Sequence, residues 1–96
     1  MLIYIDIDNT ICTTIGNDYI NSKPIQENID KINRLYDEGH TIIYWTARGA
    51  RTGHNHHELT KIQLDTWNCK HHDLISGEKP VFDLLIDDKA VKISDL

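Results

Sequence analysis

The first ten residues, Met1-Leu-Ile-Tyr-Ile-Asp-Ile-Asp-Asn-Thr10, combine an apolar run with acidic residues and indicate the fold class. Residues 1–5 and Ile7 form an almost unbroken apolar run that ends among acidic side chains. An apolar run of this length, without alternation, is typical of a strand that is buried on both faces of a parallel sheet. We therefore predict a first strand over residues 1–7, followed at once by a polar loop.

The next segments predict a flap, a helix and a second strand. Residues 9–23 mix small polar residues with scattered apolar ones, which indicates an irregular or hairpin flap with its turn at Gly16-Asn17-Asp18. Pro24 suits the first turn of a helix that ends before Gly39. Five apolar residues at helical spacing support this helix: Ile25, Ile29, Ile32, Leu35 and Tyr36. Residues 41–45, Thr-Ile-Ile-Tyr-Trp, are β-branched and aromatic and predict a second buried strand.

A second helix is expected after a loop that is rich in Gly and His. Asn55 and Glu58 are three residues apart, as in a capping box, so the helix should begin there. It would run to Trp67 and bury Leu59, Ile62 and Trp67.

Two further strands complete the pattern, a short one over residues 72–75 and another over residues 81–86, and a loop marked by Gly77 and Pro80 joins them. Strands that alternate with helices predict an open, three-layer α/β fold with a parallel, Rossmann-like sheet. There is no internal repeat, linker or low-complexity segment, so we expect one domain over residues 1–96.

Composition narrows the classes of function. Hydrophobic residues make up 40% of the chain and charged residues 26%, which is an ordinary globular balance. The formal net charge of -5 argues against nucleic-acid binding, because that depends on many Lys and Arg contacts to phosphates. There is neither an apolar stretch long enough to span a bilayer nor a basic leader, so we expect a cytoplasmic protein. Cys12 and Cys69 are then expected to be reduced thiols.

Polar side chains follow three of the predicted strands, and ligands bind beyond the carboxyl ends of the strands in such sheets. The candidate site residues are Asp6, Asp8, Thr10, Thr46, Arg48, Lys79, Asp87 and Asp88. Two carboxylates roughly 4 Å apart repel each other by about 4 kcal/mol at an effective dielectric constant near 20. A cation or shared protons must compensate this repulsion, and oxygen ligands without His or Cys favour Mg²⁺ over Zn²⁺.

The order of these residues resembles the haloacid dehalogenase (HAD) superfamily of phosphohydrolases. The family's Asp-x-Asp-x-Thr motif after the first strand is matched from Asp6 to Thr10, and its Thr or Ser after the second strand by Thr46. Lys79 and the pair Asp87-Asp88 match the Lys before the last strand and the terminal acidic pair. Asn9 departs from the pattern, because the family usually has Gly there. Asn tolerates a left-handed backbone, so the loop can keep its shape.

The resemblance implies a role for each matched residue. Asp6 would attack phosphorus and carry an aspartyl-phosphate, and Asp8 would serve as general acid and base. Thr46 and Lys79 would hold phosphoryl oxygens, while Thr10 would shape the loop. Mg²⁺ would be held by Asp6, the backbone carbonyl of Asp8, and Asp87, with help from Asp88.

The resemblance also bears on the substrate. No inserted cap domain is visible, so a large substrate or another subunit of a homo-oligomer would have to cover the open site. Capless relatives include 3-deoxy-manno-octulosonate 8-phosphate phosphatase and polynucleotide 3'-phosphatases, and the short form resembles proteins linked to polysaccharide synthesis. The acidic balance favours a sugar phosphate or other small phosphorylated metabolite over a polynucleotide.

Several alternatives remain open on the sequence alone. Arg48 could bind the distal part of a phosphorylated substrate or make a surface ion pair. A zinc site could be built from the clustered residues His54, His56, His57, Cys69, His71 and His72, although a solvated His-rich loop explains them as well. The chain could also be a phosphorylation-switch domain, or a module without catalytic activity that binds zinc or a partner.

Overall fold

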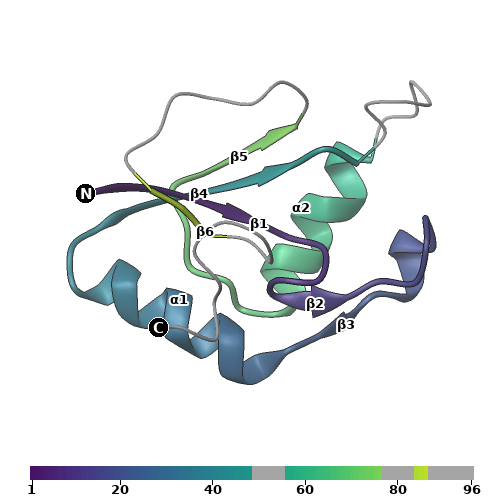
Figure 1. The fold of residues 1–96 in the computed structure, drawn as a ribbon, viewed down its shortest axis with the longest axis horizontal. Coiled ribbons are helices and arrows are strands. Elements are labelled where there is room, and N and C mark those ends of the chain that lie inside the picture. Colours follow the sequence, from purple (N-terminus) through teal and green to yellow (C-terminus); the bar gives the residue numbers. More distant parts are fainter. Residues whose placement is uncertain (49–55, 77–83, 87–96) are drawn as a thin grey trace.

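A parallel sheet of four strands lies at the centre of the protein in the computed structural model, which describes residues 1–48, 56–76 and 84–86. Its strands are β1 (Leu2–Asp6), β4 (Thr41–Thr46), β5 (Asp73–Ser76) and β6 (Leu84–Ile86). They lie in the order β5-β4-β1-β6, and every neighbouring pair is parallel (Figure 1). The predicted α/β class with a parallel sheet is therefore confirmed. Residues 81–83 of the predicted last strand lie outside the described residues.

Two helices pack on one face of this sheet. Figure 1 shows α1 (Gln26–Asp37) and α2 (His57–Thr66) on the same side of the strands. The predicted end of α1 is confirmed, since Gly39 follows it with a φ of 98°, a left-handed conformation that glycine adopts without strain. The second helical layer that a three-layer fold requires is not among the described residues and stays a prediction. No helix in the described ranges has the length and apolar character needed to cross a membrane.

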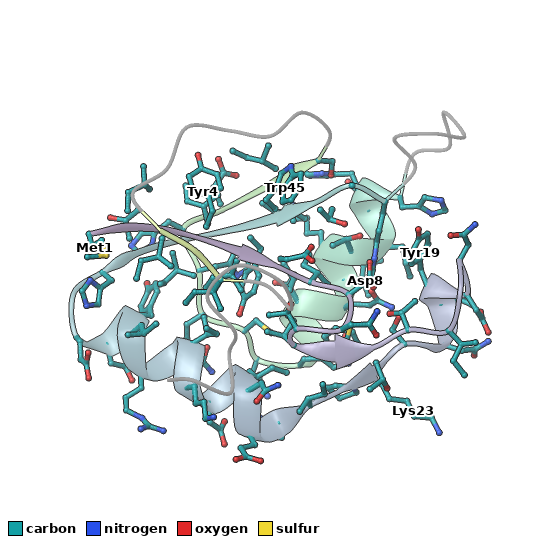
Figure 2. The ribbon with its side chains drawn as sticks, in the orientation of Figure 1. Met1, Tyr4, Asp8, Tyr19, Lys23 and Trp45 are labelled. Atoms are coloured by element: carbon teal, nitrogen blue, oxygen red, sulfur yellow. The ribbon has the colours of Figure 1, made fainter. Side chains whose placement is uncertain are left out.

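Strand register decides which side chains enter the core. Ile5 lies opposite Tyr44 on β4 and Ile86 on β6, and Tyr44 lies opposite Leu74 on β5. All four are buried and belong to one cluster with Ile29, Ile32 and Leu64 from the helices. A side chain of this size contributes about 1.5–3 kcal/mol when fully buried, so this face anchors the sheet. Tyr4 and Trp45 point away from α1, on the opposite face (Figure 2).

The predicted hairpin flap is also present. Strands β2 (Cys12–Thr13) and β3 (Lys23–Pro24) pair antiparallel, and the short 3₁₀ helix η1 (Tyr19–Asn21) lies between them. The expected role of Pro24 is wrong, because Pro24 belongs to β3 and α1 begins at Gln26. A proline is tolerated in so short a strand because it removes only one donor at a sheet edge.

Helix α2 differs from its prediction in two respects. Its N-cap is His56, which makes no side-chain capping bond, so the helix begins one residue later than expected. The capping box depends on Asn55, which lies outside the described residues, and stays a prediction. Ile62 is 58% exposed and Leu59 is half-buried, whereas Trp67 packs against the core as expected. The buried residues within α2 are Thr60, Gln63 and Leu64. The inner face of α2 is therefore largely polar, and the reason lies in the candidate site.

Candidate active site

Two predicted site residues end neighbouring strands. Asp6 is the last residue of β1 and pairs with Trp45 of β4. Thr46, the last residue of β4, therefore lies one residue beyond Asp6 in the strand direction, at the same edge of the sheet. One carboxylate oxygen of Asp6 accepts the Ile7 backbone N–H at 2.9 Å. The Thr46 hydroxyl oxygen accepts the Arg48 backbone N–H at 3.1 Å, which leaves its hydrogen to donate elsewhere, and Thr46 is only 2% exposed. The structure thus brings a carboxylate and a hydroxyl donor to the carboxyl edge of the sheet.

A tight turn follows Asp6 and Asp8. Asn9 has a φ of 62°, so the expected left-handed backbone is confirmed. Its N–H donates to the Cys12 carbonyl at 2.8 Å, and the Thr10 N–H donates to the Ile7 carbonyl at 3.1 Å. Thr10 is fully buried, and its carbonyl accepts the Asn28 side-chain amide at 2.9 Å. The backbone of Thr10 therefore helps to hold the shape of the loop.

Asp8 is held by a buried arginine. The Arg48 guanidinium contacts one oxygen of Asp8 through Nη2 at 2.7 Å and the other through Nε at 3.0 Å. The Arg48 side chain is 1% exposed and the Asp8 side chain 23%. A two-point contact of this kind fixes both the position and the plane of the carboxylate. Figure 2 shows Asp8 and Tyr19 at the end of the molecule where the flap meets α2.

The other side of Arg48 explains the polar face of α2. Its Nη1 donates to the Thr60 hydroxyl at 3.1 Å and to the side-chain amide oxygen of Gln63 at 2.5 Å. Its guanidinium carbon lies 4.8 Å from the centre of the Tyr19 ring, and the Gln63 amide nitrogen donates to the Tyr19 carbonyl at 2.6 Å. Thr60 and Gln63 are buried because they satisfy a buried cation, which would otherwise be costly.

The expectations for Arg48 need correction. Its ion pair exists, but it lies in the interior and not at the surface. An arginine has five N–H groups. In this conformation four of them donate to Asp8, Thr60 and Gln63, and the fifth, on Nη2, faces the Cys12 sulfur at 4.0 Å. Contact between Arg48 and a phosphate would therefore require these bonds to break, and it stays a prediction that the observed geometry does not favour.

Small polar residues of the flap complete the surroundings of Asp8. The Thr14 hydroxyl donates to Asp8 Oδ1 at 2.6 Å and lies 2.7 Å from the Ser22 hydroxyl. The Cys12 sulfur lies 3.8 Å from the same Asp8 oxygen. Burial raises the pKa of the Cys12 thiol, and the charge of Asp8 raises it further. Cys12 is thus a neutral neighbour of Asp8 and not a second anion.

The histidines near α2 have partners of their own. His71 Nδ1 lies 2.7 Å from the Cys69 carbonyl, and His72 Nδ1 accepts the Ile42 backbone N–H at 3.0 Å. His57 Nδ1 lies 3.2 Å from the Ser76 hydroxyl. Within residues 1–48, 56–76 and 84–86, no three His, Cys, Asp or Glu side chains are grouped closely enough to hold a metal. The zinc alternative would therefore need His54, which lies outside these ranges. Both cysteines are free thiols, as predicted.

Part of the candidate site lies outside the described residues, namely Lys79, Asp87 and Asp88. Their roles therefore stay predictions. Conversely, sequence reasoning missed the residues that surround Asp8 and Arg48, which are Thr14, Tyr19, Thr60 and Gln63. The available signal was weak: Thr60 and Gln63 are polar residues one helical turn apart on a helix that had to cover the sheet.

Comparison with known proteins supports the fold and goes no further. No family model matches the chain, and no curated protein matches it. A crystal structure of a target protein from Vibrio cholerae superimposes on this one with a TM-score of 0.76 and 23% sequence identity. The match covers 99% of this chain and 86% of that one. At this identity the likeness establishes a shared α/β fold and nothing about activity.

Proposed function

We propose that this protein is a phosphomonoester hydrolase with a HAD-like fold that works through a phosphorylated Asp6. The observation that carries the proposal is the placement of Asp6 and Thr46 at the carboxyl ends of adjacent parallel strands, with Asp8 in the loop that follows. This edge is where open α/β sheets bind their ligands. A nucleophile, a hydroxyl donor and a second carboxylate at one edge are the groups that phosphoryl transfer needs.

The first step would transfer the phosphoryl group to the protein. A carboxylate oxygen of Asp6 forms a bond to phosphorus, and the bond from phosphorus to the ester oxygen breaks with its electron pair. Asp8 gives its proton to that departing oxygen, so an alcohol leaves and Asp8 becomes a carboxylate. The hydroxyl of Thr46 donates to a phosphoryl oxygen and stabilises the negative charge spread over it.

The second step would release phosphate. A water oxygen attacks phosphorus while the Asp8 carboxylate takes a proton from that water. The bond between phosphorus and Asp6 breaks, inorganic phosphate leaves, and the Asp6 carboxylate is restored. Asp8 ends the cycle protonated, as it began, so protons balance over the two steps.

Mg²⁺ is the cofactor that suits this set of oxygen donors. The Asp6 carboxylate and the Asp8 backbone carbonyl would hold it, together with Asp87 and Asp88 from beyond the described residues. Bound there, the ion would supply positive charge that offsets the charge of the phosphoryl group. The side chain of Asp8 is already bonded to Arg48 and Thr14, so the structure favours its carbonyl over its carboxylate as a ligand.

The substrate class follows from the charge and the open edge. A net charge of -5 disfavours a long polyanion, so we propose a sugar phosphate or another small phosphorylated metabolite. A second copy of the chain could cover the site.

Substitution of the nucleophile tests the proposal. Asp6→Asn should lower Mg²⁺-dependent release of phosphate from an aryl phosphate by roughly 10³-fold or more, because the amide cannot form the acyl phosphate. Mass spectrometry of acid-quenched wild-type protein should detect one phosphoryl group, which the variant lacks.

The matched control is Asp37→Asn, the same change at an exposed residue of α1 that pairs with Lys70, and it should keep wild-type turnover. Full turnover by Asp6→Asn would end the proposal. A phosphorylated wild-type protein that decays slowly without repeated turnover would indicate a phosphorylation switch, and a preference for 3'-phosphorylated oligonucleotides would indicate the polynucleotide alternative.

A further inference from the structure

The two carboxylate oxygens of Asp8 have unequal surroundings. Oδ1 accepts the Thr14 hydroxyl at 2.6 Å and Arg48 Nη2 at 2.7 Å, with Arg48 Nε at 3.2 Å. Among the described residues, Oδ2 accepts only Arg48 Nε, at 3.0 Å. An oxygen that already accepts several donors has no lone pair left for a proton, whereas Oδ2 has room for one.

We propose that Arg48 and Thr14 are positioning residues that hold Asp8 with Oδ2 as the oxygen that gives and takes the proton. This inference rests on the proposed function, in which Asp8 is the acid and base. It assigns Arg48 a role through Asp8, in place of a contact with phosphate. It also assigns a role to Thr14, which the sequence did not single out.

Arg48 connects the parts of the candidate site. Its backbone N–H donates to the Thr46 hydroxyl, while its guanidinium holds Asp8. Arg48 therefore orients both Thr46, the hydrogen-bond donor to the phosphoryl group, and Asp8, the general acid. Thr60 and Gln63 fix the far end of the guanidinium. Because a misplacement of about 1 Å can cost a hundredfold in rate, such a support is valuable at an active site.

Stability alone is a poor explanation for this arrangement. Burying a guanidinium with its partners is often no better for stability than well-packed apolar residues of the same volume. Here a chain of 96 residues devotes two buried polar residues of α2, Thr60 and Gln63, to one cation that faces Asp8. A requirement to orient Asp8 accounts for that cost.

The test uses the leaving group as a probe of proton transfer. The value of kcat/KM reports the steps up to phosphorylation of Asp6, and protonation matters most when the departing oxygen is basic. It would be measured with Mg²⁺ for a series of aryl phosphates, from strongly to weakly acidic phenols, and for an alkyl phosphate. The variants are Thr14→Val, which removes only the hydroxyl, Thr14→Ser, which keeps it, and Arg48→Lys, which keeps the charge but not the two-point contact.

We expect Thr14→Val and Arg48→Lys to lose roughly 10- to 100-fold with the alkyl phosphate, a part of the 10²- to 10⁴-fold contribution of a general acid. With the most acidic phenol the loss should be about threefold or less, because that leaving group needs no proton. Thr14→Ser should stay close to wild type throughout. Lys70→Met, which removes the cation of the exposed pair with Asp37, is the matched control and should change nothing.

Each outcome decides the question. A loss that is equal across the series, or no loss in Thr14→Val, overturns the positioning role while leaving the phosphatase intact. A wild-type protein without Mg²⁺-dependent turnover of any substrate overturns the proposed function, and the positioning role with it. Thr14 is only partly buried in the flap, so Thr14→Val decides the matter even if Arg48→Lys does not fold.

Discussion

Arg48 shows how a single residue takes its role from partners that are distant in sequence. Asp8 lies 40 residues before it, and Gln63 lies 15 residues after it. The motif around Thr46 drew attention to Arg48, but no local pattern indicates whether a guanidinium faces solvent or the interior. Its burial could be recognised only once the flap, the first loop and α2 were placed around it.

The left-handed backbone of Asn9 predicts how substitutions at this residue change the free energy of unfolding. Its φ of 62° is a conformation that costs an ordinary L-residue about 1–2 kcal/mol. Asn9→Val should therefore lower the free energy of unfolding by at least about 1 kcal/mol, whereas Asn9→Gly should leave it nearly unchanged. Urea unfolding followed by tryptophan fluorescence would measure both.

Thr13→Val is the control for Asn9, because Thr13 is an exposed residue of β2 outside the left-handed region. It should shift the free energy of unfolding by no more than about 0.5 kcal/mol. If Asn9→Val and Asn9→Gly unfold at the same urea concentration, the backbone conformation of the loop is not what Asn9 supports.

Helix α2 shows where prediction from apolar spacing fails. Leu59 and Ile62 stand three residues apart and indicate one inner face, but the buried residues are Thr60, Gln63 and Leu64. These three also have helical spacing, yet only one of them is apolar. Thr60 and Gln63 on this face accept hydrogen bonds from Arg48, and a pattern that counts hydrophobic residues cannot indicate such polar partners. Helix α1 has no such demand, so its apolar stripe predicted its buried residues Ile29 and Ile32 correctly.

The orientation of α2 on the sheet can be tested with two apolar residues of the helix, one buried and one exposed. Leu64 is fully buried and Ile62 is 58% exposed on the same helix. Leu64→Ala should lower the free energy of unfolding by about 2–5 kcal/mol, because it leaves a cavity in the core. Ile62→Ala should change it by no more than about 0.5 kcal/mol. Equal losses in chemical denaturation would mean that α2 presents its other face to the sheet.

At the scale of the molecule, the central strands were the most predictable part of the fold. Strands β1 and β4 are apolar runs bounded by polar residues, and that pattern follows directly from burial between layers. The same reasoning placed Asp6 and Thr46 at one edge, since parallel neighbours end together. It could not find the bonds between Asp8, Arg48 and Thr14, because hydrogen bonds among the flap, a loop and a helix depend on packing that no periodicity encodes.

The buried thiol of Cys69 and the buried phenol of Tyr44 predict how the stability of the whole molecule depends on pH. Burial raises the pKa of the Cys69 thiol to about 12 from an ordinary value of 9.0, and burial likewise raises the pKa of Tyr44. A raised pKa means that the folded state resists ionisation while the unfolded state does not. The contribution to stability is therefore complete below about pH 9 and is lost as pH rises through the folded-state value.

Urea unfolding at a series of pH values would measure this loss. The free energy of unfolding should be level between about pH 7 and 8.5 with respect to these two groups, and it should fall from about pH 9 to 12. Cys69→Ala should flatten part of this decline, although it also lowers stability at neutral pH by creating a cavity. The same burial should protect both thiols from a disulfide reagent at about pH 8 until urea unfolds the chain, because only the thiolate reacts. Alkaline curves for Cys69→Ala and wild type that run parallel would show that the Cys69 thiol ionises as easily in the folded protein as in the unfolded chain.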